Sequence, residues 1–190
     1  MKTSAQIFRE PASEALLPDL SPLEEIYATR GLPLPPVARV TPKEMPEPAR
    51  TLLVHNSDMT STLENFYHDR LRVRVLGSRA AGFKYFRGVA LNLEGNGRLV
   101  EFGATKVNLN LLPAAAQDEI LREEQPLGRI LAVCGVRFAS RPAGYLRVFA
   151  DEFIRHTMGL EGVHTLYGRR NTLWDAWDRP LAEIVEILPP

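Results

Sequence analysis

The sequence predicts an α+β domain in which helices gather on one side of an antiparallel β-sheet. Three consecutive segments between residues 70 and 111 alternate or run apolar at strand length, and glycine-containing turns join them. Two more strand patterns lie at residues 164–173 and 181–188, close to the C-terminus. Helical patterns stand between these groups of strands. With 190 residues, of which 45% are hydrophobic, the chain is long enough to bury a core.

The first 50 residues differ in composition from the rest of the chain. Nine of the 15 prolines lie there, and the segment "GLPLPPVARVTPKEMPEPAR" indicates extended chain. One short helix is predicted at about residues 22–30, because Ser21 suits its N-cap and Gly31 its end. We therefore divide the chain into a proline-rich N-terminal arm, residues 1–50, and a domain, residues 51–190. The arm packs on the domain, covers a sheet edge or mediates dimerisation, and its composition favours none of these.

Capping and breaking residues divide the domain into its elements. Asp58 or Thr60 suits the N-cap of a helix in "DMTSTLENFYHDRL". The segment "PAAAQDEILREEQPLGRIL" is helical and must end or bend near Pro126. The segment "GYLRVFADEFIR" fits either a strand or a helix, whereas the last two segments are predicted strands.

Charge and composition exclude several kinds of partner. The 23 basic and 23 acidic side chains give a formal net charge of zero, so no overall field favours nucleic acid or an anionic membrane. The N-terminal residues contain only short apolar pieces broken by charge and proline, which matches neither a secretory signal nor a membrane span. A cytoplasmic protein is therefore predicted, and its oligomeric state is left open.

Common catalytic and metal-binding motifs are missing from the sequence. The four histidines have no metal-ligand spacing, and the single cysteine, Cys134, cannot form an intrachain disulfide. The segment "EGNGR" lacks the lysine and the helix of a phosphate-binding loop, and no serine lies in a nucleophile elbow. We therefore expect neither a metal nor a cofactor.

Charged residues inside apolar strands are the strongest functional signal. Arg87 interrupts "KYFRGVAL", where an unpaired buried guanidinium would be costly, so it needs an anionic partner. That partner is a strand glutamate, Glu101 or Glu186, or the carboxylate of a ligand.

The last strand carries a second such charge. Glu186 shares its face of the strand with Ile184, and burial there would raise the pKa of its carboxyl group. Glu183 differs in parity and is expected to face solvent. Arg169 and Arg170 must point to opposite faces if their segment is extended, so at most one can share a site with Arg87.

Six short motifs resemble the chorismate lyase (chorismate pyruvate-lyase) family. They are "SDMT", "YFRGVAL", "EFGATKV", "PLGRIL", "LYGRRNTL" and "PLAEIVEILP", which occur in the family's order over about residues 51–190. The resemblance implies an antiparallel sheet with a pocket closed by helical flaps. It also implies conversion of chorismate into 4-hydroxybenzoate and pyruvate without metal or redox cofactor.

The resemblance assigns roles to individual residues. Arg87 would grip a substrate carboxylate, and Glu186 would act as the catalytic group at the hydroxyl end. An arginine of the "GRR" pair would hold a second carboxylate or brace the pocket. The substrate-binding residues implied are Met59, Arg87, Leu127, Lys106, Arg169 and Arg170.

The chain departs from the family pattern after the glycine of "EFGATKV". A well-studied member has an arginine there, whereas this chain has Ala104, with Lys106 as a substitute of equal strand parity. Alignment of the last strand through "VEILP" matches Glu186 to the family's glutamate, whereas a shifted register would match Glu183 to it.

Two alternatives to the lyase stay open. The first is a non-catalytic domain that binds a small carboxylate, because effector-sensing domains of some bacterial repressors look like this fold. Those repressors carry an N-terminal helix-turn-helix, for which residues 1–50 contain too many prolines. The second is a lyase that acts on another aromatic-acid precursor. The predicted partner is a small-molecule aromatic carboxylate, although the repressor domains of similar fold bind small carboxylates or sugars.

Overall fold

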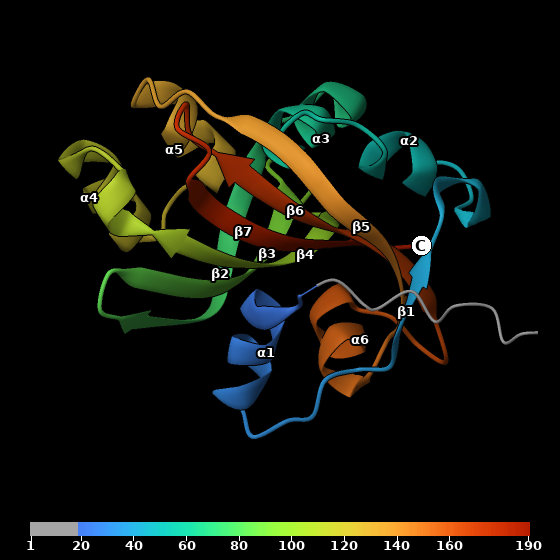
Figure 1. Ribbon diagram of the computed structural model, residues 1–190. Coiled ribbons are helices and arrows are strands. Elements are labelled where there is room, and N and C mark those ends of the chain that lie inside the picture. The colour runs from blue at the N-terminus through green and yellow to red at the C-terminus, as the bar shows by residue number, and fades with distance from the viewer. Residues whose placement is uncertain (1–18) are drawn as a thin grey trace, which may run out of the picture.

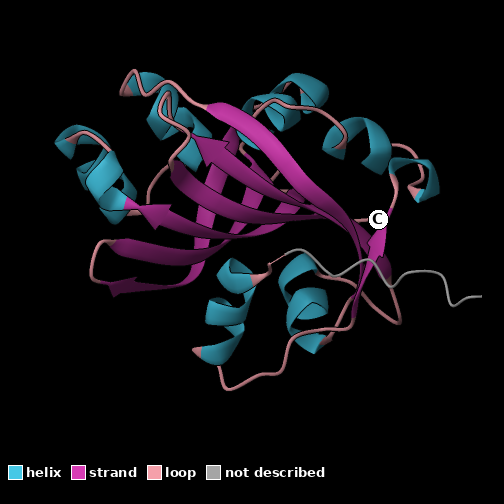
Figure 2. Ribbon diagram, viewed as in Figure 1, coloured by secondary structure: helices cyan, strands magenta, loops and turns pink. Residues whose placement is uncertain are grey.

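The computed structural model describes residues 19–190 of the chain. Within this range one antiparallel sheet has the strand order β1-β5-β6-β7-β4-β3-β2 (Figures 1 and 2). Its strands are β1 (Val37–Val40), β2 (Leu71–Ala81), β3 (Lys84–Leu93), β4 (Leu99–Asn108), β5 (Ala139–Phe149), β6 (Thr165–Trp174) and β7 (Pro180–Leu188). The predicted α+β class is confirmed, and the first predicted strands form the meander β2-β3-β4.

The helices lie against the faces of this sheet. They are α1 (Ser21–Ala28), α2 (Ala49–Leu53), α3 (Met59–Tyr67), α4 (Ala114–Arg122), α5 (Leu127–Val133) and α6 (Glu152–Met158), with short 3-10 turns at Pro42–Glu44 and Leu109–Leu111. Helices α2 to α5 gather on one face, as the sequence predicts, and α1 and α6 pack on the other (Figure 1).

Local sequence signals explain where several helices begin and end. The Asp58 side chain accepts a hydrogen bond from Ser61 N at 2.9 Å and caps α3. Pro126 precedes α5 and separates it from α4, because proline cannot continue a helix. The ambiguous segment "GYLRVFADEFIR" divides between the end of β5 and the start of α6, where Asp151 is the N-cap.

The register of the central strands decides which side chains meet. In β4 and β7, Gly103 pairs with Glu186, and in β6 and β7, Arg169 pairs with the same glutamate. Side chains alternate along each strand, so Glu186 and Arg169 point to the face covered by α2 to α5. Residues one position away, including Val185, point to α1 and α6.

Helix α1 and strand β1, both from residues 19–50, add to these layers. Helix α1 buries Leu23 and Ile26 against β3 and β4, and β1 pairs with β5 as an edge strand. The contact is close at Gly88, where an ideal Cβ atom would lie 2.9 Å from Ile26. The arm's first 18 residues lie outside the described part of the chain.

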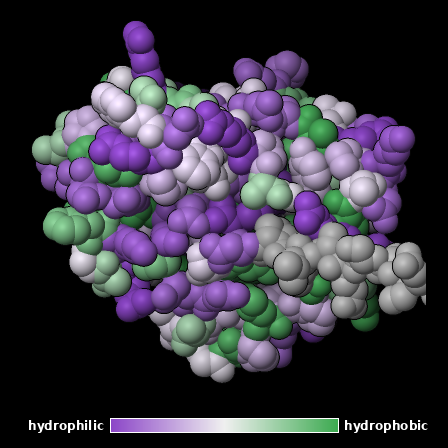
Figure 3. Space-filling view, viewed as in Figure 1, coloured by the Kyte–Doolittle hydropathy of each residue, from purple (hydrophilic) through white to green (hydrophobic). Residues whose placement is uncertain are grey.

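The face of the molecule drawn in Figure 3 is mixed in character. Hydrophilic and hydrophobic residues are interspersed over the face in Figure 3, which has no single continuous apolar area of the kind that marks a large interface. Within residues 19–190, no helix combines the length and apolar composition required to cross a bilayer.

Candidate ligand-binding site

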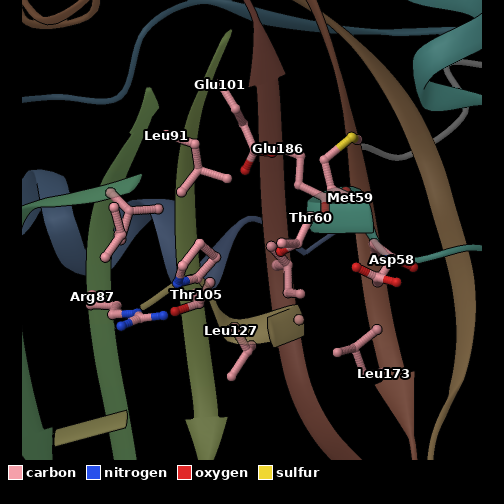
Figure 4. A pocket seen from close by; sticks show the side chains of 16 residues that line it. Asp58, Met59, Thr60, Arg87, Leu91, Glu101, Thr105, Leu127, Leu173 and Glu186 are labelled. Atoms are coloured by element: carbon pink, nitrogen blue, oxygen red, sulfur yellow. The ribbon is translucent and has the colours of Figure 1, made fainter. Parts of the chain in front are cut away.

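A cavity lies between the sheet and the N-terminal ends of α3 and α5 (Figure 4). Its volume is about 40 Å³. Its apolar lining includes Val73, Val89, Leu91, Leu127, Leu173 and Ile184. Its polar lining includes Asp58, Thr60, Arg87, Glu101, Thr105 and Glu186. A mainly apolar cavity with a few convergent polar groups is typical of a small-molecule site.

Arg87 on β3 supplies a buried positive charge at one end of the cavity. The residue is 1% exposed, and its Nη2 donates a hydrogen bond of 3.2 Å to the carbonyl of Gln125. Its Nε and Nη1 have no hydrogen-bond partner in residues 19–190, and no carboxylate there forms an ion pair with it. Burial lowers the pKa of Arg87, while Tyr85 and Glu123 partly oppose this effect. The strand glutamates suggested as partners therefore do not pair with it.

Thr105 and Glu101 on β4 add polar atoms without partners. The Thr105 hydroxyl and Glu101 Oε2 are buried and make no hydrogen bond within the described region. Thr105 stands opposite Arg87 in the β3–β4 register, and Figure 4 shows the Arg87 guanidinium directed toward it. Glu101 lies at the other end of the cavity, beside Glu186 (Figure 4). Alternation along β4 places both residues on the same face of the sheet as Arg87 once the pairing of β3 with β4 is known.

Glu186 is neutralised by Arg169 on the neighbouring strand. Arg169 Nε forms a short ion pair with Glu186 Oε2, and the two residues are 0% and 2% exposed. The remaining guanidinium nitrogens of Arg169 donate to the carbonyl groups of Leu53, His55 and Ser57 at 3.1–3.2 Å. Arg169 thus fixes the segment that leads into α3, and each of its three guanidinium nitrogens already has a partner in the protein.

His55 completes this bracing network. Its Nε2 lies 2.7 Å from the Leu52 carbonyl and its Nδ1 accepts a hydrogen bond from Ser57 N at 3.1 Å, which assigns the proton to Nε2. Burial and the nearby Arg169 lower the pKa of His55, so the ring is neutral at pH 7.

Helices α3 and α5 meet over the cavity. An ideal Cβ atom at Gly128 would lie 2.6 Å from Asp58 Oδ1 and 2.7 Å from Thr60 Oγ1, so the approach requires glycine. Arg129 and Glu64 also form an ion pair between the two helices. The side chains of Met59 and Leu127 line the cavity from these helices.

Lys106 and Arg170 lie on the opposite face of the sheet and do not line the cavity. Both pair with Glu183, at 2.7 Å from Lys106 Nζ and 2.5 Å from Arg170 Nη2. Ala104 is buried on that face as well. Alternation along β4 and β6 explains this placement: it separates Lys106 from Thr105, and Arg170 from Arg169.

Five of the seven residues predicted from the sequence thus lie at the cavity or directly behind it. Met59, Arg87, Leu127 and Glu186 line it, and Arg169 holds Glu186. The described residues contain no cluster of histidine, cysteine or carboxylate side chains that would hold a metal ion.

Solved structures of transcriptional regulators share this fold. PhnF from Mycobacterium smegmatis matches with a TM-score of 0.55 and 11% sequence identity, over 71% of this chain and 64% of that chain. Its effector domain matches with a TM-score of 0.52 and 11% identity, over 69% of this chain and 87% of that chain. The ligand-binding domain of a GntR-family transcriptional regulator from Bordetella bronchiseptica matches with a TM-score of 0.50 and 15% identity, over 63% of this chain and 85% of that chain.

These likenesses establish the architecture of the chain. The chain spans less than two thirds of the whole PhnF regulator, and at these identities the match concerns the fold. No protein-family model matches the sequence, and no curated protein matches it. The chorismate lyase-like architecture expected from the sequence agrees with the ligand-binding domains of these regulators.

The expectation of a carbon–oxygen lyase is wrong by this comparison. The solved structures that share the fold are regulators and their ligand-binding or effector domains. The site agrees with this correction, because Glu186, the proposed catalytic group, is held in an ion pair with Arg169. The substitute cation, Lys106, lies on the other face of the sheet, so it cannot hold the second carboxylate of chorismate.

Proposed function

We propose that this chain is a binding domain for a small aromatic carboxylate, which it holds in the cavity through Arg87. The observation that carries the proposal is the buried guanidinium of Arg87, which has two nitrogens without partners in residues 19–190. A guanidinium binds a carboxylate through two parallel hydrogen bonds, and such charge-assisted bonds are the strongest that side chains make.

An unpaired buried charge such as that of Arg87 destabilises the folded protein. Removal of an ion from water costs several kcal/mol after relaxation of the protein. The single bond from Arg87 to the Gln125 carbonyl offsets only part of that cost. A ligand carboxylate supplies the missing partner, and the apolar lining beside it suits a hydrocarbon ring.

The cavity must enlarge to admit such a ligand. A volume of about 40 Å³ holds two or three water molecules. A dry cavity of about 150 Å³ is known to hold benzene. Separation of α3 from α5, which breaks the ion pair between Arg129 and Glu64, opens the cavity with the sheet left in place. Such a step lowers the association rate below that of a preformed site.

The proposed role is ligand sensing or carriage. The compared domains are described as ligand-binding and effector domains of regulators, which supports a binding role for a chain of the same fold. DNA binding is no part of the proposal for this chain. The cytoplasmic location and the division of the chain at residue 50 stay predictions.

Calorimetric titration with benzoate and 4-hydroxybenzoate tests the proposal. We expect saturable binding to the wild-type protein and a loss of about 10- to 150-fold in affinity in Arg87→Met, since a charged hydrogen bond contributes about 1.5–3 kcal/mol. Arg79→Met is the matched control, because Arg79 lies on the same sheet but is exposed and paired with Glu25. Equal affinity of the wild type and Arg87→Met, or no binding at millimolar ligand, would refute the proposal.

A further inference from the structure

Glu101 occupies an unusual position at the end of the cavity away from Arg87. It is 3% exposed, and its Oε2 has no hydrogen-bond partner among the described residues. Its Oε1 lies where the side chain of residue 103 would otherwise be, since an ideal Cβ atom at Gly103 would be 2.7 Å away. Glycine at position 103 therefore creates the space that the Glu101 carboxyl group fills, beside Glu186.

The surroundings of Glu101 disfavour a negative charge on it. The groups around the cavity that carry charge or titrate are Arg87 on β3, Glu186 on β7, Arg169 on β6, Asp58 at the start of α3, and His55 in the segment before α3. Burial raises the pKa of Glu101 well above its usual range, Glu186 raises it further, and Arg169 partly opposes them. Among the described residues, the cation that lowers the pKa of Glu101 is Arg169, which is already paired with Glu186.

The charges facing the cavity leave one positive charge without a partner. Arg169 and Glu186 neutralise each other and the Asp58 carboxylate caps α3, whereas Arg87 forms no ion pair in the described region and is attracted by the nearby Glu123. A monoanion balances Arg87. A second carboxylate at the far end of a ligand would lose its hydration there, and the nearby Arg169 could not compensate for it because Arg169 is already paired with Glu186.

The strand geometry sets the length of a suitable ligand. Glu101 lies four residues from Thr105, which stands opposite Arg87, so about 13 Å separates the two backbone positions at about 3.3 Å per residue. In Figure 4 the Glu101 side chain points toward the middle of the cavity, and the Arg87 guanidinium is directed toward Thr105. One aromatic ring with a polar group at each end fits between them.

Building on the proposed function, we propose that Glu101 determines ligand specificity: its uncharged carboxyl group donates a hydrogen bond from Oε2 to an oxygen acceptor on the ligand. The cavity then selects monocarboxylates that carry a hydroxyl, ether or carbonyl oxygen opposite the carboxylate. It rejects dicarboxylates of the same length. Glu101 is a binding residue in this inference, and Arg87 remains the anion anchor.

A matched series of benzoates tests this assignment by calorimetry. The probes are benzoate, 4-hydroxybenzoate, 4-formylbenzoate, whose carbonyl is only an acceptor, and terephthalate, which is a dicarboxylate. We expect the wild type to bind the hydroxyl and formyl compounds about tenfold more tightly than benzoate, and terephthalate most weakly. An ionised Glu101 would instead disfavour the formyl compound.

Two variants separate hydrogen bonding from other effects. Glu101→Gln keeps an N–H donor and should retain the preference for the formyl compound, whereas Glu101→Leu should lose it and bind benzoate within about threefold of wild type. If Glu101→Leu retains the preference while Arg87→Met abolishes binding, the Glu101 inference alone fails. If no probe binds the wild type, both the proposed function and this ligand role fail.

A measurement without ligand gives an independent result. Carbon-13 spectra of the glutamate carboxyl groups, with Glu101→Gln as the assignment control, report directly on the proton. We expect the Glu101 carboxyl to remain protonated at pH 7. Titration of this group below pH 5 would overturn the inference whatever the binding data show.

Discussion

Replacement of Arg87 with methionine should stabilise the ligand-free protein even though it removes the proposed ligand anchor. The guanidinium is 1% exposed and makes one hydrogen bond, 3.2 Å long, to the Gln125 carbonyl. Methionine replaces the aliphatic part of arginine, fills an irregular apolar space well and needs no partner. Removal of the unpaired charge should therefore favour the folded state.

The size of the effect follows from the contacts of Arg87. Burial of an ion costs several kcal/mol, and one hydrogen bond from a charged donor returns about 1.5–3 kcal/mol. Water in a cavity of about 40 Å³ and the nearby Glu123 return a further part. We expect a net gain of about 1–2 kcal/mol in the free energy of unfolding. For a chain of this size it corresponds to a rise in Tm of about 2–8 °C.

Arg169→Met provides the matched contrast on the same face of the sheet. It strands Glu186 without its partner and removes the hydrogen bonds to the carbonyl groups before α3. The expected loss is about 3–5 kcal/mol, or a fall in Tm of at least about 6 °C. Scanning calorimetry of both variants at pH 7 measures whether Tm rises or falls, and urea unfolding checks the change in the free energy of unfolding. A comparable fall in Tm for Arg87→Met would mean that Arg87 is a structural charge, and the reasoning would be refuted.

Two further predictions concern capping and pH. Asp58→Ala removes the α3 cap, so it should lower the free energy of unfolding by about 1 kcal/mol and Tm by about 2–4 °C. Asp151→Ala, which removes the α6 cap, should lower stability by the same amount. Only Asp58→Ala should change the affinity for benzoates. If both variants change affinity equally, α3 has no special part in covering the cavity. Glu101 keeps its proton in the native state at pH values where the unfolded side chain, with a pKa of about 4.3, ionises. The native state then binds more protons than the unfolded state, so the free energy of unfolding falls as pH rises above about 4.3, by up to about 1.4 kcal/mol per pH unit. Urea titrations from pH 4 to 8 measure this dependence, which Glu101→Gln should remove. An unchanged pH dependence in Glu101→Gln would contradict the buried proton.

The lyase expectation illustrates the limits of short motifs. The glycines in "LYGRR" and "EFGATKV" are needed for close packing: an ideal Cβ atom at Gly168 would lie 2.4 Å from the Glu186 carbonyl, and Gly103 gives room to Glu101. Such requirements belong to the fold and recur wherever the same strands meet. A motif that satisfies them therefore indicates architecture before chemistry.

Alternation along the strands was readable from the sequence. It predicted that Glu186 would share the inner face with Ile184 and that Arg169 and Arg170 would point apart, and both are found. The same rule predicts that Lys106 faces away from Thr105, because neighbouring residues of a strand lie on opposite faces. Lys106 was nevertheless assigned to the substrate, because nothing in the sequence marks which face of β4 is the inner one.

The sequence by itself determined the α+β class, most elements and the presence of charges on the inner strands, because local periodicity and capping fix these features. Only the tertiary structure decided how those charges are matched. Arg169 takes Glu186 across the β6–β7 register, which leaves Arg87 without a counter-ion, and Gly103 makes space for Glu101. These relations depend on which distant strands become neighbours, and that choice is made by packing of the whole sheet rather than by any local segment.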